Sequence, residues 1–202
     1  MEWLVLIVIV AAVIYFLRSR GKPQASLAHL PEQFVVFDLE TTGLDPRKHE
    51  ILEFGAIRVN RDSINHDTFQ SLVKPSRKVP KKITELTGIN QAMLDAEGVP
   101  IESALREFLN FVGDLHLVSF NADFDMAFLQ STATKHSISI GNPVSCALKM
   151  SRRAWPGRKS YRLADLAKDG NLRSDGTHRA LGDCQRALIV YTAAASKLGT
   201  AK

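Results

Sequence analysis

Apolar positions along the chain predict strands in its first part and strands alternating with helices in its second part. Short apolar or alternating runs predict five strands, at residues 34–37, 51–59, 64–73, 115–120 and 143–147. Apolar residues at helical spacing predict three helices, at residues 100–112, 123–133 and 180–198. A polar turn at residues 60–63 joins the second and third strands in a hairpin. This order of elements predicts an α/β fold with a mixed sheet and helices packed on it.

The N-terminal residues differ in composition from the rest of the chain. Residues 3–17 carry no charge and are apolar on all sides, so they lack the polar face of a surface helix. As a helix these 15 residues would reach about 22 Å, against roughly 30 Å of hydrocarbon, and a snorkelling Arg18 would extend them. A signal peptide would have a basic residue where Glu2 stands, and a buried core helix at the very terminus would be unusual. We therefore expect one N-terminal transmembrane helix, an uncleaved anchor at residues 1–17.

The charges that follow this apolar run predict its orientation. Arg18, Arg20 and Lys22 come directly after it, and basic residues stay on the cytoplasmic side of a membrane. We expect a single-pass membrane protein whose C-terminal domain faces the cytoplasm. The polar segment at residues 18–33 contains glycine and prolines and is interpreted as a linker, which leaves a compact domain at residues 34–198.

Composition places the chain among ordinary globular proteins, because 45% of the residues are apolar and 23% are charged. The two cysteines, Cys146 and Cys184, are too few for a disulfide scaffold or a four-ligand zinc site, so we expect them to be reduced. The net charge of +5 suits a polyanionic partner. Nucleic acid and an anionic membrane surface both fit that charge.

The first candidate catalytic residues directly follow the strand at residues 34–37. Asp38 and Glu40 are two positions apart, so the alternation of side chains along a strand turns both to one face. Two carboxylates so placed can share a hard cation, although an acidic pair at a strand end is often plain solvated surface. The string Asp-x-Glu-Thr-Thr-Gly that contains them has a chance expectation of only about 0.0002 in a chain of this length. Its last residue, Gly43, permits a tight turn.

Two further acids and a histidine fall at the start of predicted helices. Asp125 lies in the first turn of the helix at residues 123–133, where an acid also stabilises the helix dipole. Asp183 lies in the first turn of the last helix, and His178 lies in the loop before it. Each of these residues, taken alone, has a plain structural explanation.

Together these residues resemble the motifs of the DEDD exonuclease superfamily, in the DnaQ-like branch whose third motif contains histidine (DEDDh). The matching residues, in order and in spacing, are Asp38 and Glu40 for the first motif, Asp125 for the second, and His178 and Asp183 for the third. The resemblance extends over the compact domain. It implies an RNase H-like fold, a mixed sheet with flanking helices, behind the N-terminal helix.

The resemblance also implies an activity, the metal-dependent 3′–5′ exonuclease hydrolysis of single-stranded DNA. Two Mg²⁺ ions about 3.5–4 Å apart, with Mn²⁺ as an alternative, would activate the attacking water and stabilise the leaving oxygen. Asp38 would bridge both ions, Glu40 and Asp183 would complete one site, and Asp125 would lie nearer the other. His178 would accept the proton from the attacking water as a general base.

Two basic runs fit a track for nucleic acid. Residues 74–82 contain five basic residues and no acid, and residues 149–162 contain six, with two aromatic residues among them. Cations contact phosphates and aromatic rings stack on unpaired bases, although a solvated surface explains either run equally well. The expected substrate-binding residues are Thr41, Thr42, Lys149, Arg152, Arg153, Trp155, Arg158 and Tyr161.

Three other functions remain open at the level of the sequence. An exonuclease for RNA or for very short oligonucleotides would use the same acids. A catalytically inactive nucleic-acid-binding module tethered to a membrane would need the positive charge but not four convergent carboxylates. A dedicated polymerase subunit is the third, but the chain ends four residues after Leu198, without a tail to hold a polymerase. Association with a polymerase is therefore not indicated.

Overall fold

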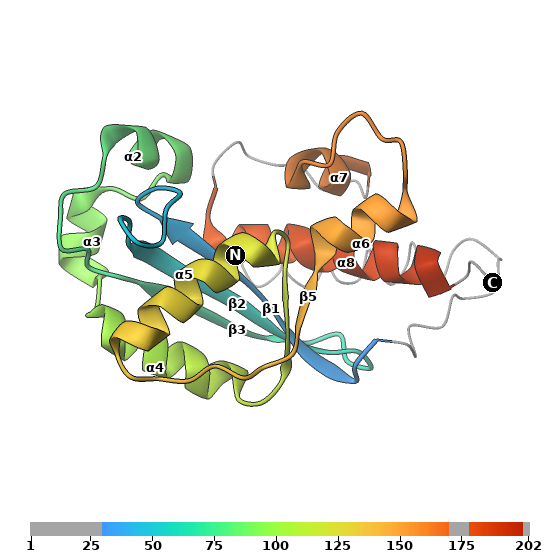
Figure 1. Cartoon of the computed structure of the whole chain (residues 1–202), viewed down its shortest axis with the longest axis horizontal. Helices are drawn as coiled ribbons and strands as arrows, with labels where there is room; N and C mark the ends of the chain where they lie inside the picture. The colour runs from blue at the N-terminus through green and yellow to red at the C-terminus, as the bar shows by residue number, and fades with distance from the viewer. Residues whose placement is uncertain (1–29, 170–177, 200–202) are drawn as a thin grey trace.

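The computed structural model describes residues 30–169 and 178–199, and a five-stranded sheet lies at its centre (Figure 1). The strands occur in the order β3-β2-β1-β4-β5. Their bounds are Gln33–Thr41 for β1, Ile51–Asn60 for β2, Asp67–Leu72 for β3, His116–Ser119 for β4 and Val144–Cys146 for β5. β1 pairs with β2, and β2 with β3, in antiparallel fashion, whereas β4 is parallel to both β1 and β5. The predicted mixed sheet is therefore confirmed.

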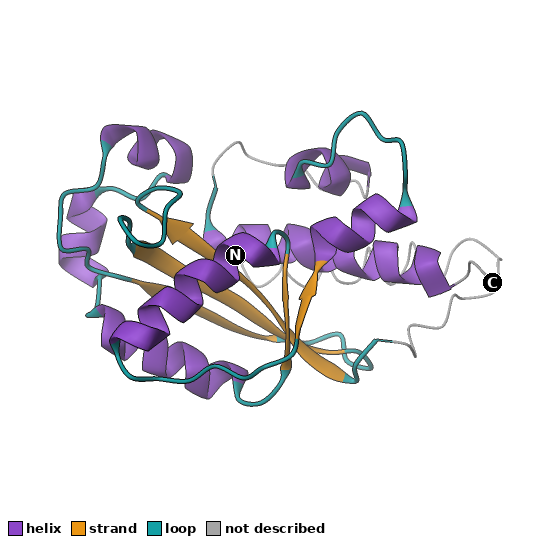
Figure 2. Cartoon of the chain, in the orientation of Figure 1, coloured by secondary structure: helices purple, strands orange, loops and turns teal. Residues whose placement is uncertain are grey.

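Helices cover the sheet, and Figure 2 shows them around the strands. The helices are α2 (Lys81–Thr87), α3 (Gln91–Glu97), α4 (Ile101–Val112), α5 (Ala122–Lys135), α6 (Ala147–Ala154), α7 (Leu163–Asp169) and α8 (Ala180–Gly199). Helices α4, α5 and α8 are the three that the apolar pattern predicts. The pattern does not predict α2, α3, α6 and α7, each of which has at most eight residues.

Strand β1 alternates between two cores, one on each face of the sheet. Val35, Phe37 and Leu39 belong to the core that is completed by side chains of α4 and α5. Phe34 and Val36 belong to the opposite core, which is completed mainly by α8. Because the alternation continues along the strand, Asp38 and Glu40 lie on the face that α8 covers. The prediction that these two acids share one face is confirmed by this arrangement.

A glycine in β2 lets the start of α8 lie directly against the sheet. A Cβ atom at Gly55 would lie 2.6 Å from the carbonyl carbon of Ala180 and 2.6 Å from the nitrogen of Leu181. Both are backbone atoms, so only a residue without a side chain fits at this level. The first turn of α8 is therefore held against β2 at Gly55, which is paired with Asp38 of the neighbouring strand β1.

The N-terminal expectations require a correction. The anchor expected at residues 1–17 and most of the linker at 18–33 fall outside the described residues, whereas Leu30 is buried in the core beside Phe34. Within residues 30–169 and 178–199, none of the helices combines the length and apolar character that a membrane span requires. The described helices give no support to the prediction of a single-pass membrane protein with its domain on the cytoplasmic side, and that prediction is withdrawn.

Candidate active site

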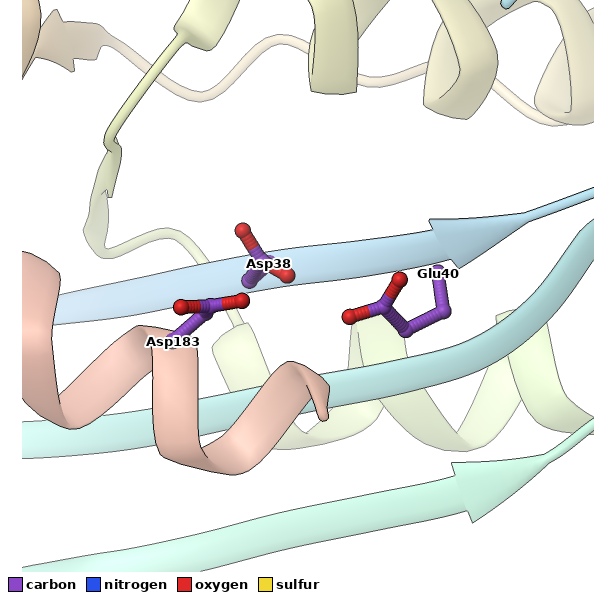
Figure 3. Close-up of side chains that lie close together, drawn as sticks. All are labelled: Asp38, Glu40 and Asp183. Atoms are coloured by element: carbon purple, nitrogen blue, oxygen red, sulfur yellow. The ribbon is translucent and has the colours of Figure 1, made fainter. Parts of the chain in front are cut away.

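Three carboxylates converge at the C-terminal end of β1. Asp38 and Glu40 extend from β1 and Asp183 from the first turn of α8, and all three point toward one another (Figure 3). Each can offer one carboxylate oxygen such that these oxygens lie within 4.8 Å of one another. Glu40 and Asp183 are buried, and Asp38 is partly buried. An all-oxygen set of mutually repelling acids fits a hard divalent cation such as Mg²⁺, which prefers carboxylate ligands.

The surroundings of these acids oppose their ionisation. Burial raises the pKa of Asp38 well above its usual value, and the charges of Asp125 and Asp183 raise it further. Burial, followed by the charge of Asp183, raises the pKa of Glu40 to about 8. Burial also raises the pKa of Asp125 to about 7. A bound cation would favour the charged carboxylates and so offset this cost.

Asp125 reaches the acidic centre from the other side of β1. It lies in the first turn of α5, as the sequence predicts, and its side chain is buried. The pairing of β1 with β4 stops at Val36, so beyond this point the backbone of β1 is open toward α5. The carboxylate of Asp125 accepts hydrogen bonds from the Ser119 hydroxyl and from the backbone of Leu39, and both lower its pKa against the effect of burial. Asp125 thus lies beside the group of three carboxylates and is not a member of it.

His178 contacts the acidic centre directly. Its Nδ1 atom lies 2.9 Å from Oδ2 of Asp183, and half of its side chain is exposed. Its backbone N–H donates to the carbonyl oxygen of Leu86 at the end of α2, at 3.1 Å. The other oxygen of Asp183, Oδ1, accepts a hydrogen bond from Nε of Arg186 at 2.8 Å and forms an ion pair with Nη2 of the same residue at 2.8 Å. The carboxylate of Asp183 is therefore held from two sides, and the sequence analysis did not anticipate Arg186.

A fourth buried acid, Glu53 on β2, is also absent from the predicted site. Its side chain is fully buried and accepts hydrogen bonds from Nη2 of Arg179 at 2.7 Å and from Nε2 of Gln70 at 2.8 Å. Glu53 is directly opposite Glu40 in the β1–β2 ladder. An acid within the otherwise apolar run at residues 51–57 is the signal that could have identified it.

The expected substrate-binding threonines have structural partners. The Thr41 hydroxyl donates to the carbonyl oxygen of Gly43 at 2.7 Å. The Thr42 hydroxyl accepts a hydrogen bond from the backbone N–H of Glu50 at 2.9 Å. Both hydroxyls shape the loop that follows β1. At Gly43 a Cβ atom would lie 2.4 Å from the His49 ring, which agrees with the tight turn expected there.

The expected basic and aromatic track lies on α6 and on the loop that follows it. Several of its members pair within the chain: Lys149 with Asp123 at 2.7 Å, Arg158 with Asp169 at 2.5 Å, and the Tyr161 hydroxyl with the carbonyl oxygen of Trp155 at 2.5 Å. Arg152 lies over the Tyr161 ring, 6.0 Å from its centre. Arg152 and Arg153 are exposed in the last turn of α6.

The raised pKa values predict how the stability of the metal-free protein depends on pH. In the unfolded chain these acids titrate near 4, so between about pH 5 and pH 8 the folded state binds more protons than the unfolded state. Stability therefore falls as the pH rises through this range. We expect the melting temperature in EDTA to be lower at about pH 8 than at about pH 5.5, and Mg²⁺ to restore it most at the higher pH. A melting temperature in EDTA that is constant or rises over this range would contradict the shifts.

The site combines acids at the end of the central strand of a mixed sheet with acids from two helix starts and a histidine. This arrangement defines a metal-dependent nuclease of the RNase H-like fold. The comparisons with known proteins agree with this class. The profile of the Exonuclease family matches residues 35–191. The chain belongs to this exonuclease family. The predicted metal-dependent 3′–5′ exonuclease activity on nucleic acid is confirmed, and so is the DEDDh resemblance.

Individual relatives cover the same region of the chain. DNA polymerase III subunit epsilon of Aquifex aeolicus is 40% identical over 151 residues, which are 74% of this chain and 74% of that protein. The PolC-type DNA polymerase III of Caldanaerobacter subterraneus is 36% identical over 86% of this chain, which spans only 12% of that longer protein. The nuclease domain of 3′hExo, a DEDDh family member bound to rAMP, matches with a TM-score of 0.68 at 20% identity, over 81% of this chain and 92% of that one. This last likeness concerns the fold.

Two relatives bear on the expectation about partners. The sequence analysis found no indication of polymerase association. A relative that is 40% identical is itself a polymerase subunit, and another is a polymerase that contains the matched region. The membrane partner expected from residues 1–17 finds no support among the described helices. A nucleic-acid partner agrees with the family.

Proposed function

We propose that the chain removes nucleotides from the 3′ end of single-stranded DNA, with residues 34–198 as the catalytic domain. The observation that carries this proposal is the convergence of Asp38, Glu40 and Asp183 within 4.8 Å beside a histidine that contacts one of them. A protein that only bound nucleic acid would not need carboxylates whose buried charges repel one another and the substrate. DNA is favoured over RNA because relatives that are 40% and 36% identical are a subunit of DNA polymerase III and a PolC-type DNA polymerase III.

In the proposed site, four acids hold the metal ions and His178 handles the proton. Asp38, Glu40 and Asp183, with Asp125 beside them, would hold Mg²⁺, as two ions, with Mn²⁺ as the substitute. Bound divalent ions would neutralise the phosphodiester and lower the pKa of the attacking water. The protein supplies oxygen ligands that are fixed before substrate arrives: Arg186 holds one oxygen of Asp183, and Ser119 holds Asp125.

The contact between His178 and Asp183 fits a general base. If Nδ1–H donates to Oδ2 of Asp183, then Nε2 carries the free lone pair and can accept a proton from water. The negative Asp183 would also stabilise the imidazolium that results. Half of the His178 side chain is exposed, so water and a strand end can reach it.

One assay tests the substrate class. The purified full chain with Mg²⁺ is given end-labelled single-stranded DNA, duplex DNA, RNA of the same sequence, and dinucleotides. We expect 3′-terminal nucleotides to be released fastest from single-stranded DNA and release to stop in EDTA. Faster release from RNA or from dinucleotides would replace the proposed substrate by the corresponding alternative. Binding without hydrolysis of any of them would leave only the inactive binding module.

Charge reversal in α6 tests the proposed strand contact. In Arg152→Glu/Arg153→Glu we expect a raised KM, unchanged turnover at saturating substrate and a shallower dependence of KM on salt. The reason is that each lost phosphate contact removes about one released counterion. The measurement is KM for single-stranded DNA over a series of salt concentrations.

The matched control makes the same change of charge elsewhere. Arg106→Glu/Lys135→Glu reverses two exposed basic residues on α4 and α5, which cover the sheet face opposite α8. This variant should keep the wild-type salt slope. Equal slopes in both variants and the wild type would assign Arg152 and Arg153 to the solvated surface.

A further inference from the structure

We propose that the ion pair between the fully buried Glu53 and the partly exposed Arg179 is a clamp that positions His178 for catalysis. This proposal rests on the proposed function of His178 as general base and adds two positioning residues that are not among the five motif residues. Neither residue needs to touch the substrate. The clamp joins strand β2 to the short segment that carries the histidine into the site.

Glu53 lies in the sheet, and its carboxylate bonds to the side chain of Arg179. It is fully buried. Nη2 of Arg179 donates to Oε1 at 2.7 Å, and Nε donates to both oxygens, to Oε1 at 3.1 Å and to Oε2 at 3.2 Å. Gln70 on β3 donates to Oε1 as well, at 2.8 Å, which fixes the carboxylate from the strand side. The guanidinium fork matches a carboxylate in a way that a lysine ammonium cannot, so the pair sets a direction as well as a charge.

The same carboxylate also holds the start of α8. Its second oxygen, Oε2, accepts the backbone N–H of Ala180 at 2.9 Å, one of the helix N–H groups that have no partner within the helix. The Glu53 carboxylate therefore binds the side chain of Arg179 and the backbone N–H of Ala180. The preceding residue is held as well, because the backbone N–H of His178 donates to the carbonyl oxygen of Leu86 at 3.1 Å. Three successive residues are thus anchored at two places in the fold: His178 at Leu86, and Arg179 and Ala180 at Glu53.

This anchoring fixes the backbone of His178, although its side chain is half exposed. The imidazole needs only its contact with Asp183 to define its direction once its backbone is fixed. A histidine in a loose segment would lose that contact for much of the time, and a displacement of about 1 Å can cost about 100-fold in rate. A role for Arg179 in binding substrate phosphate fits less well, because Nε and Nη2 both donate to Glu53.

A double-mutant cycle tests whether Arg179 acts through His178. Arg179→Lys keeps the charge beside Glu53 and removes the fork, and we expect it to lower kcat by about 10–100-fold with KM nearly unchanged. In a His178→Ala background the same change should lower kcat by less than about twofold, since there is no base left to position. Arg106→Lys, which alters an exposed arginine–glutamate pair on α4, is the matched control and should leave kcat unchanged.

A second measurement does not depend on activity. Histidine side-chain ¹H–¹⁵N spectra of the full chain should show one ordered tautomer for His178 in the wild type and loss of that order in Arg179→Lys. If Arg179→Lys does not fold, Glu53→Gln/Arg179→Met, which leaves no unpaired buried charge, takes its place with the same expectations. Wild-type kcat in the clamp variants, or losses that multiply with that of His178→Ala, would overturn the clamp. Wild-type turnover in His178→Ala alone would instead overturn the proposed function, and the clamp with it.

Discussion

Replacing Asp38 by asparagine should abolish hydrolysis, with turnover lowered by more than about 10³-fold, because a metal site supplies several kcal/mol of transition-state stabilisation. Asp38 is the acid whose pKa is raised by burial and by the charges of four other acids. The Asp38→Asn variant removes the carboxylate of Asp38 without changing the shape of its side chain. Steady-state turnover on single-stranded DNA at saturating Mg²⁺ measures the loss.

The same variant should be more stable than the wild type when no metal is present. The folded wild-type protein has to hold repelling carboxylates, and asparagine relieves part of that repulsion. The melting temperature of Asp38→Asn in EDTA at about pH 8 should therefore exceed that of the wild type, and Mg²⁺ should raise it less. Full activity in Asp38→Asn would exclude the proposed metal site, and a large drop in its melting temperature would mean that activity was lost by unfolding.

Replacing His178 by alanine should lower turnover by about 10²–10⁴-fold, the usual contribution of a positioned general base. Oxygen ligands are unchanged in this variant, so the Mg²⁺ concentration that gives half-maximal activity should stay close to the wild-type value. Single-turnover rates at saturating enzyme, measured from acid to alkaline pH, separate proton transfer from product release. In the variant the rate should keep rising with pH, since hydroxide then replaces the histidine.

A second histidine provides the control for this experiment. His136 at the end of α5 also lies near a carboxylate, with Nδ1 at 3.6 Å from Oε2 of Glu102. His136→Ala should therefore keep the wild-type rate and pH profile. A His178→Ala enzyme that behaves in the same way would show that His178 is a bystander.

The sequence contained much of the site because alternation and helix starts are local properties. The faces of Asp38 and Glu40 follow from the period of a strand, and Asp125 and Asp183 fall in first turns as expected. The short helices were missed because seven or eight residues hold too few apolar repeats to give a clear period.

Long-range partners could not be predicted in this way. Glu53 bonds to Arg179, which lies 126 positions further along the chain, and nothing local to either residue points to the other. Ser119 and Arg186 likewise gain their roles only when the sheet brings β1, α5 and α8 together. The apolar run at residues 3–17 lies outside the described residues, and the membrane localisation predicted from its composition alone finds no support among the described helices.

The absence of a side chain at Gly55 sets the distance between β2 and the start of α8, and with it the distance between the acids of the catalytic centre. Because the backbone of α8 lies against β2 there, a single methyl group would have to push the helix away from the sheet. The acids on β1 and the acid on α8 would then separate, although every residue of the motif would still be in the sequence. A chain of this kind can therefore carry an intact DEDDh signature and be inactive, so homologues with a larger residue at this position need a check of sheet-to-helix distance before an activity is assigned to them.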